Sequence, residues 1–229
     1  MKTDEAYFDN KVIQKPWGLE YVVLRIKNLL SVTFLEIKPG KKTSLHCHTN
    51  KKTGFIVVQG KAKLNLGIVN KTSRTFDPIS KITIHPRLFH SIKCVSKIPM
   101  HALEFETPAD KNDLVRFDDK YGRINKSYET KFIKMNKNKL LKFLDIKKFQ
   151  SQNLKHNKVS YSIQTHKNFK KILKEKGKTI FAVLGGNIVD GKRKKLLKYG
   201  DTVTASVLKK FSSFYKIEKN LTLLKVTKN

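Results

Sequence analysis

Short apolar segments recur through the first half of the chain, and clusters of turn-forming residues separate them. The segments are residues 21–26, 29–37, 53–60, 62–69, 81–86, 89–95 and 100–107. They are β-branched or alternate between apolar and polar residues, and Gly, Pro, Asn or Lys clusters stand between them at roughly regular spacing. Many short strands with turn signals between them are typical of a β-sandwich or barrel. The sequence therefore predicts a mainly β fold for this half.

The second half of the chain is organised differently at its start. The stretch "NKLLKFLDIKKFQ" (138–150) places Leu140, Leu141, Leu144 and Lys148 at helix-like intervals, which predicts a helix or a hinge near a domain boundary at about residue 130. Alternating segments return from residue 158 onward. Residues 54–67 and 179–191 share a strand, glycine turn, strand layout, which favours a duplicated β-domain. Alternatively, the two segments are unrelated, because any two antiparallel hairpins share this layout.

Composition narrows the class of protein. Hydrophobic residues make up 39% of the chain and aromatic residues 10%, as in folded globular proteins. No apolar run approaches the roughly 20 residues of a membrane span. The start carries acidic residues and lacks the apolar segment of a secretory signal, and only two cysteines occur, Cys47 and Cys94. We therefore expect a cytoplasmic protein that does not bind a membrane.

The formal net charge of +31 raises the question of a nucleic-acid partner. Of 49 basic residues only six are Arg. Specific recognition of phosphates or bases usually recruits Arg, because its planar fork binds two acceptors at once. The lysine excess therefore argues against a nucleic-acid partner and is better explained by a compositional bias. Nonspecific affinity for anions, including sugar phosphates, is expected in either case.

Three histidines form a candidate metal site. His46 and His48 are two residues apart on a predicted strand, so both side chains point to one face and Cys47 to the other. His90 begins another strand, which a barrel can bring beside the first. Zn, Fe, Mn, Co and Ni all accept imidazole, so the identity of a divalent metal stays open. The alternative is that the histidines are structural or solvated. His85 and His101 are further candidates.

The surrounding residues carry a resemblance to a known family. The spacing of the first cupin motif is followed by Gly40, His46, His48, Thr53 and Gly60, except that Thr53 replaces the usual glutamate. "HPRLFH" (85–90) resembles a shortened second cupin motif. "KPWG" (15–18), "IKPGKKTSLHCH" (37–48) and "DLVRFDDKYGR" (113–123) resemble the mannose-6-phosphate isomerase type II group. The resemblance covers about residues 11–125.

This resemblance implies a fold and an activity. The fold is a cupin-type antiparallel β-barrel (jelly roll) over residues 1–130, with a helical connector at 131–157 and a degenerate second cupin-like domain without metal ligands at 158–229. The activity is the metal-dependent aldose–ketose isomerisation of a sugar phosphate such as mannose 6-phosphate. The carried-over roles are metal ligation by His46, His48 and His90 and binding of an anionic sugar substrate by Lys15, Arg116 and Arg123. We further expect catalysis by Arg116 and Glu104. A homodimer is one further option, with residues 126–229 as a dimerisation surface, a lid or a second binding site.

Thr53 leaves the reaction open. A glutamate would supply an anionic ligand or carry a proton, and a threonine hydroxyl is a weak substitute for either role. Glu36, Glu104 or Glu106 could supply the missing carboxylate. If none does, three histidines can hold a metal alone, as in iron dioxygenase-type cupins. The last alternative is a non-catalytic cupin that binds a carbohydrate or nucleotide sugar.

Overall fold

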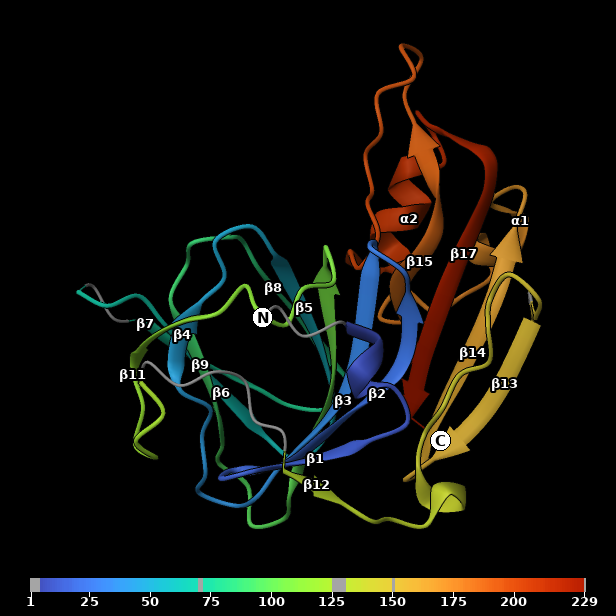
Figure 1. Ribbon diagram of the computed structural model, residues 1–229. Helices are drawn as coiled ribbons and strands as arrows, with labels where there is room; N and C mark the ends of the chain where they lie inside the picture. The colour runs from blue at the N-terminus through green and yellow to red at the C-terminus, as the bar shows by residue number, and fades with distance from the viewer. Residues whose placement is uncertain (1–4, 70–71, 125–130, 150, 229) are drawn as a thin grey trace. The chain divides into compact units, whose positions relative to one another are not determined.

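The computed structural model describes residues 5–69, 72–124, 131–149 and 151–228 and consists mainly of antiparallel strands, which confirms the predicted fold class. The chain forms two compact units, residues 1–142 (unit 1) and 143–229 (unit 2), which we describe separately (Figure 1). No helix in the described ranges is long and apolar enough to cross a membrane.

Unit 1 contains two β-sheets. The first runs in the order β12-β1-β2-β3-β10-β5-β8. Its strands are β1 (Val12–Lys15), β2 (Gly18–Ile26), β3 (Leu30–Ile37), β5 (Lys52–Gln59), β8 (Ser80–Ile84), β10 (Met100–Thr107) and β12 (Phe132–Ile133). Two 3-10 turns, η1 (Glu5–Phe8) and η2 (Lys137–Lys139), lie outside the sheets. Every pairing in this sheet is antiparallel.

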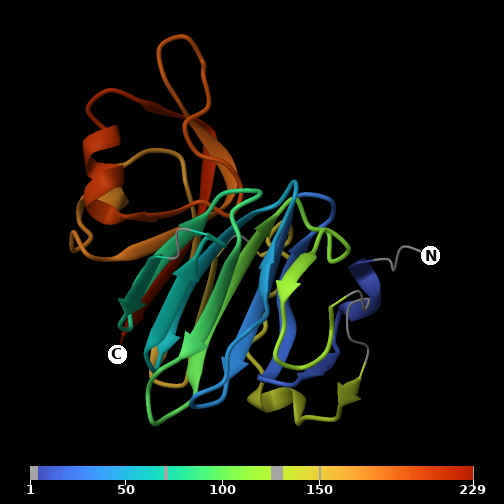
Figure 2. The ribbon, with the colours of Figure 1, turned by 90° about the vertical axis from the view of Figure 1, so that its left-hand side faces the viewer.

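The second sheet of unit 1 runs in the order β11-β4-β9-β6-β7. Its strands are β4 (Leu45–Cys47), β6 (Ala62–Leu66), β7 (Thr72–Phe76), β9 (His90–Cys94) and β11 (Val115–Asp118). Figure 2 looks onto this sheet, with yellow-green β11 at one edge and blue-green β7 at the other. The strand order interleaves early and late segments, which places residues far apart in sequence on one face.

The two sheets pack face to face around one core. Side chains from the first sheet, such as Leu35 and Phe55, share a buried cluster with Leu64 and Ile92 from the second. Residues on a strand alternate between faces, so only alternate positions reach this interior. The Trp17 ring is buried in the same cluster. Polar residues that share the inward face must therefore line a cavity or find partners inside the barrel.

Gly18 shows why "KPWG" needs its glycine. Gly18 begins β2 with φ of 154°, and a Cβ built there would lie 1.9 Å from the carbonyl oxygen of Glu36. A side chain at this position would force the backbones of β2 and β3 apart. The close approach lets Trp17 turn into the core while Lys15, on the adjoining strand, stays buried.

Unit 2 has its own sheet and core. The strands, in the order β13-β14-β17-β15-β16, are β13 (Ser151–His156), β14 (Val159–His166), β15 (Ile180–Val189), β16 (Thr202–Thr204) and β17 (Lys216–Lys228). Helices α1 (Lys170–Leu173) and α2 (Ala205–Phe211) contribute Ile172 and Leu208 to the core. A cupin barrel needs two facing sheets, and the described residues of unit 2 form one. The expectation of a degenerate second cupin barrel is therefore not met.

The helix predicted at 138–150 is also wrong. In residues 131–149 the structure has β12 and η2 but no α-helix, and residues 125–130 and 150 lie outside the described part. The reason is that side-chain burial alternates with a period of two residues. Leu141 and Phe143 are buried, whereas Lys142 and Leu144 are exposed. The Leu141 N–H donates a hydrogen bond to the Tyr21 hydroxyl at 3.1 Å rather than to a helical carbonyl.

Candidate metal centre and its cavity

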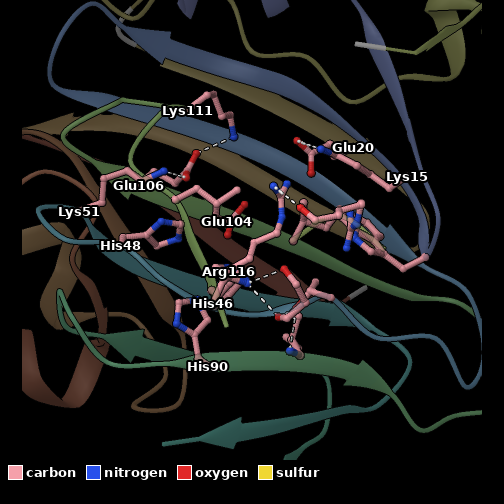
Figure 3. A pocket seen from close by; sticks show the side chains of 18 residues that line it. Lys15, Glu20, His46, His48, Lys51, His90, Glu104, Glu106, Lys111 and Arg116 are labelled. Atoms are coloured by element: carbon pink, nitrogen blue, oxygen red, sulfur yellow. Dashed lines mark hydrogen bonds and ion pairs between the residues drawn. The ribbon is translucent and has the colours of Figure 1, made fainter. Parts of the chain in front are cut away.

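Three histidines from neighbouring strands face one another inside unit 1. His46 lies in β4, His48 follows that strand, and His90 begins β9, where it is the antiparallel partner of His46. The ring centroids are 4.5 Å apart for His46 and His90, 5.1 Å for His46 and His48, and 5.5 Å for His48 and His90. Their ligand nitrogens all lie within 4.8 Å of one another (Figure 3). The structure thus brings together the three histidines that the sequence singles out.

Backbone carbonyls fix the orientation of all three rings. The acceptors of the Nδ1 hydrogen bonds are the carbonyl oxygens of Ser44 for His46 (2.9 Å), Asp113 for His48 (2.6 Å) and Leu88 for His90 (2.9 Å). A carbonyl oxygen only accepts, so each Nδ1 carries the proton and each Nε2 keeps a lone pair. The Nε2 atoms of His48 and His90 are buried without a hydrogen-bond partner. Metal-ligating histidines are held in this way, so the donor set fits a divalent metal ion.

The histidines are also in the protonation state that a metal requires. Burial lowers the pKa of His48 to about 3 and that of His90 to about 4. Burial and the two neighbouring histidines hold the pKa of His46 well below its usual value. All three imidazoles are therefore neutral near pH 7, and a metal ion would displace no proton from them.

Asp113 secures the segment that carries His48. Its carbonyl binds His48, and its carboxylate accepts the backbone N–H groups of Thr49, Asn50 and Lys51 at 2.7, 2.9 and 2.8 Å. The Thr49 hydroxyl donates to the same carboxylate at 2.6 Å. These hydrogen bonds favour the charged form and keep the pKa of Asp113 at about 2. The "DLVRFDDKYGR" segment thus shapes the metal centre through its first residue.

No carboxylate oxygen joins the group of three histidines in the part of the chain that the structure describes. The Glu106 carboxylate is buried and is held by Lys51 at one oxygen and Lys111 at the other, each at 2.6 Å. Glu36 pairs with His101 at 3.3 Å and does not line the cavity. Glu104 lines the cavity without joining the ligand group. The donor set is therefore three neutral imidazoles, and His85, which is exposed, is not part of it.

The histidines open into a cavity of about 610 Å³, a volume that includes the space at its mouth. The size is in the range of small-molecule sites. Its charged lining consists of Lys15, Glu20, Lys51, Glu104, Glu106, Lys111, Arg116 and Arg123. Lys15, Arg116 and Arg123, which the sequence assigns to an anionic substrate, all belong to this lining, as does Glu104. Five basic side chains against three carboxylates give the lining an excess of positive charge.

Each predicted substrate-binding side chain has a neighbour that positions it. The Lys15 ammonium lies 3.7 Å from the Glu20 carboxylate. The Arg123 guanidinium is fixed by Asp119, with a closest contact of 2.6 Å. Arg116 donates from Nη1 to the carbonyl of Arg123 at 3.5 Å. The two arginines of "DLVRFDDKYGR" are thus linked at the cavity wall.

Sequence reasoning missed Lys51, Lys111 and Asp113. Lys51 and Lys111 are buried, although lysine is almost never fully buried unless it is paired. With 43 lysines in the chain, no sequence pattern singles out Lys111. The position of Lys51, three residues after His48, is the one local signal that could have indicated it.

Comparisons with known proteins identify the family of the first half of the chain. The family model described as "Mannose-6-phosphate isomerase C-terminal" matches residues 2–119. The xanthan biosynthesis protein XanB of Xanthomonas campestris is 29% identical over 125 residues, which are 52% of this chain and 25% of that protein. The alginate biosynthesis protein AlgA of Pseudomonas putida is 27% identical over 123 residues, 51% of this chain and 24% of that protein. The chain thus spans about a quarter of the length of these curated relatives.

Among solved structures, the capsular polysaccharide assembling protein CapF of Staphylococcus aureus is similar over 47% of this chain and 34% of that one, with 20% identity and a TM-score of 0.43. The family match rests on sequence and covers just over half of the chain. It includes "KPWG", the paired histidines, His90 and Arg116. The chain therefore belongs to the family of the mannose-6-phosphate isomerase C-terminal domain, a cupin-type β-barrel.

Proposed function

We propose that this protein is a metal-dependent enzyme that converts a phosphorylated sugar between its aldose and ketose forms in the cavity of unit 1. The observation that carries the proposal is the convergence of three oriented, neutral histidines in a cavity whose lining has more cations than carboxylates. A phosphate monoester brings the negative charge that such a lining favours. The metal would be held by His46, His48 and His90.

The chain supplies the groups that the reaction needs. A divalent metal, when bound, would polarise the substrate oxygens at the two carbons that exchange a proton. Lys15, Arg116 and Arg123 would hold the phosphate and orient the sugar. Glu104 would take the proton from the carbon beside the aldehyde and return it to the aldehyde carbon. The hydroxyl proton passes between the two neighbouring substrate oxygens, so atoms and charge balance.

Glu104 is suited to carry a proton. Burial and the nearby Glu106 carboxylate raise the pKa of Glu104 to about 8. A group whose pKa lies near the working pH both accepts and returns a proton efficiently. In Figure 3 the Glu104 carboxylate lies between the Lys51–Glu106–Lys111 group and Arg116.

The metal requirement is tested by metal analysis of the purified wild-type protein and the His48→Ala variant. The proposal expects stoichiometric divalent metal in the first and its loss in the second. Absence of metal from both, after growth and reconstitution with each candidate ion, would leave a non-catalytic carbohydrate-binding protein.

The reaction is tested by following mannose 6-phosphate and fructose 6-phosphate by NMR. General acid–base groups contribute about 10²- to 10⁴-fold, so Glu104→Gln should lower kcat by that factor while metal content stays constant. Glu36→Gln, on the neighbouring strand but outside the cavity, is the matched control and should leave kcat unchanged. Full activity of Glu104→Gln would remove Glu104 from the mechanism.

One observation favours a second candidate. A donor set of three histidines without a carboxylate is compatible with a non-haem iron dioxygenase. Oxygen consumption by the iron-loaded protein with small thiols separates the two reactions, because isomerisation consumes no oxygen.

Two expectations from the sequence belong to this proposal. The cysteines Cys47 and Cys94 are free and buried, in keeping with a reducing cytoplasm. A homodimer is the oligomeric state to test, by sedimentation of the purified chain.

A further inference from the structure

Thr53 occupies an inward-facing position on β5. It shares a strand face with Phe55, which lines the cavity, and it is the direct antiparallel partner of Glu106. Directly opposed residues of an antiparallel pair project to the same face. Thr53 is fully buried, and its Oγ1 has no hydrogen-bond partner. The nearest substitute for a carboxylate at position 53 is therefore the one at position 106, on the adjacent strand.

Glu106 does not give this wall a net negative charge, because two lysines offset its carboxylate. Both of its oxygens are held by buried ammonium groups, those of Lys51 and Lys111. The three residues together carry one net positive charge and stand on the wall that the histidines share. A metal cation held by the histidines on this wall would be repelled by that net positive charge.

The charge balance of the whole lining also disfavours a metal cation that binds alone. Five basic side chains face three carboxylates, and Asp119, bound to Arg123, adds a fourth. The net charge is therefore +1 without a metal, even with Glu104 ionised. A divalent ion held by neutral imidazoles raises it to +3. In a cavity walled by protein, such an excess of positive charge makes the binding free energy of the metal unfavourable unless an anion enters with it.

We propose that metal binding at this centre is coupled to the binding of an oxyanion, and that Thr53 and Lys51 set the strength of the coupling. The inference rests on the metal site of the proposed function. The ligand chemistry is a phosphate group, carried either by a sugar or by inorganic phosphate. The protein then binds its metal weakly alone and tightly together with the anion.

Coupling of this kind is reciprocal. If the anion raises the affinity for metal by a given factor, the metal raises the affinity for the anion by the same factor. Couplings between ligands typically amount to about 5- to 150-fold. Repulsion between a divalent ion and the one net positive charge of the Lys51–Glu106–Lys111 group is the physical source of such a coupling here.

The experiment measures the Kd for Co²⁺ by equilibrium dialysis of the full-length, metal-free protein. The arms contain mannose 6-phosphate, inorganic phosphate, mannose, or chloride at matched ionic strength. We expect about a tenfold or greater decrease in Kd with either phosphate and none with mannose or chloride. A decrease with the sugar phosphate only would assign the coupling to the monoester, and a decrease with both would assign it to the phosphate group.

Two variants test the residues. Thr53→Glu adds a carboxylate on the inward face directly opposite Glu106, which offsets the positive charge of the wall, so Co²⁺ should bind more tightly without phosphate and the effect of phosphate should fall to about twofold or less. Lys51→Met removes one positive charge and leaves Glu106 with Lys111, so it should act in the same direction. Lys41→Met, at an exposed lysine in the same unit, is the control and should retain the wild-type coupling. Lys51→Met carries the test if Thr53→Glu does not fold.

The outcomes separate this inference from the proposed function. Tight Co²⁺ binding that phosphate leaves unchanged would overturn the coupling and leave the metal enzyme intact. Phosphate-dependent binding without isomerisation would support the coupling and remove the isomerase. Equal effects of chloride and phosphate would reduce the observation to ionic strength and overturn the inference.

Discussion

At the scale of single residues, Glu106 shows how strongly one buried charge can depend on its partners. Its oxygens contact two ammonium groups at 2.6 Å, and all three side chains are at most 5% exposed. Glu106→Ala would leave Lys51 and Lys111 buried without their counter-ion, which costs about 3–5 kcal/mol. We expect that loss in the free energy of unfolding measured in urea. Glu36→Ala, at a partly exposed pair, should cost about 0–1 kcal/mol; equal losses would contradict the buried triad.

The histidines give the metal-free protein a pH dependence at the same scale. In the unfolded chain His48 titrates at its ordinary pKa of 6.5, whereas in the folded chain its pKa is about 3. Between these values only the unfolded state binds the proton, so the contribution of His48 to stability is lost as the pH falls below 6.5. Glu104, with its pKa raised to about 8, acts in the opposite sense. The test compares urea unfolding midpoints at neutral and mildly acidic pH. The decrease in midpoint on acidification should be smaller for His48→Ala than for the wild type.

At the scale of strands, much of unit 1 follows from sequence and some of it does not. The segments predicted at 53–60 and 100–107 are β5 and β10, because strands buried on both faces are rich in apolar and β-branched residues. The strands β7 and β11 were not predicted, since their residues are mostly exposed and neither segment shows an apolar run. The common face of His46 and His48 could be predicted because they form an H-x-H pair, and His90 joins them through the pairing of β4 with β9. The Lys51–Glu106–Lys111 group was not, because its members meet only through strand pairing and a loop.

Gly18 provides a test of the pairing between β2 and β3. Gly18→Ala should lower the stability of unit 1 by several kcal/mol, because its Cβ would lie 1.9 Å from the Glu36 carbonyl oxygen and the strands must separate. Gly40→Ala is the control: φ is 73° but nothing lies within 4 Å of a Cβ, so only the backbone preference is lost, about 1 kcal/mol. Urea unfolding of both variants measures the difference. Equal effects would mean that the close contact relaxes without cost.

At the scale of the whole molecule, the chain consists of two units with separate hydrophobic cores, and the three-histidine group that could hold a metal belongs to the first. A sequence pattern could indicate that two β-regions exist. It could not show that the second is a single five-stranded sheet, because alternation predicts strands and leaves open how they are paired. The resemblance to a known family ends within unit 1, so it predicts nothing about how the strands of unit 2 are paired.

The two cores lead to a prediction about unfolding. A ligand that binds only the folded form of one unit stabilises that unit by mass action. Adding Co²⁺ with phosphate should therefore raise the temperature of one calorimetric transition and leave a second one unchanged. Leu208→Ala, in the core of unit 2, removes a fully buried side chain at a cost of about 2–5 kcal/mol and should lower the second transition alone. His48→Ala should abolish the response to metal without moving the second transition. A single transition that shifts with metal and also with Leu208→Ala would instead mean that the two units unfold as one cooperative structure, because each perturbation would then reach residues that it does not contact.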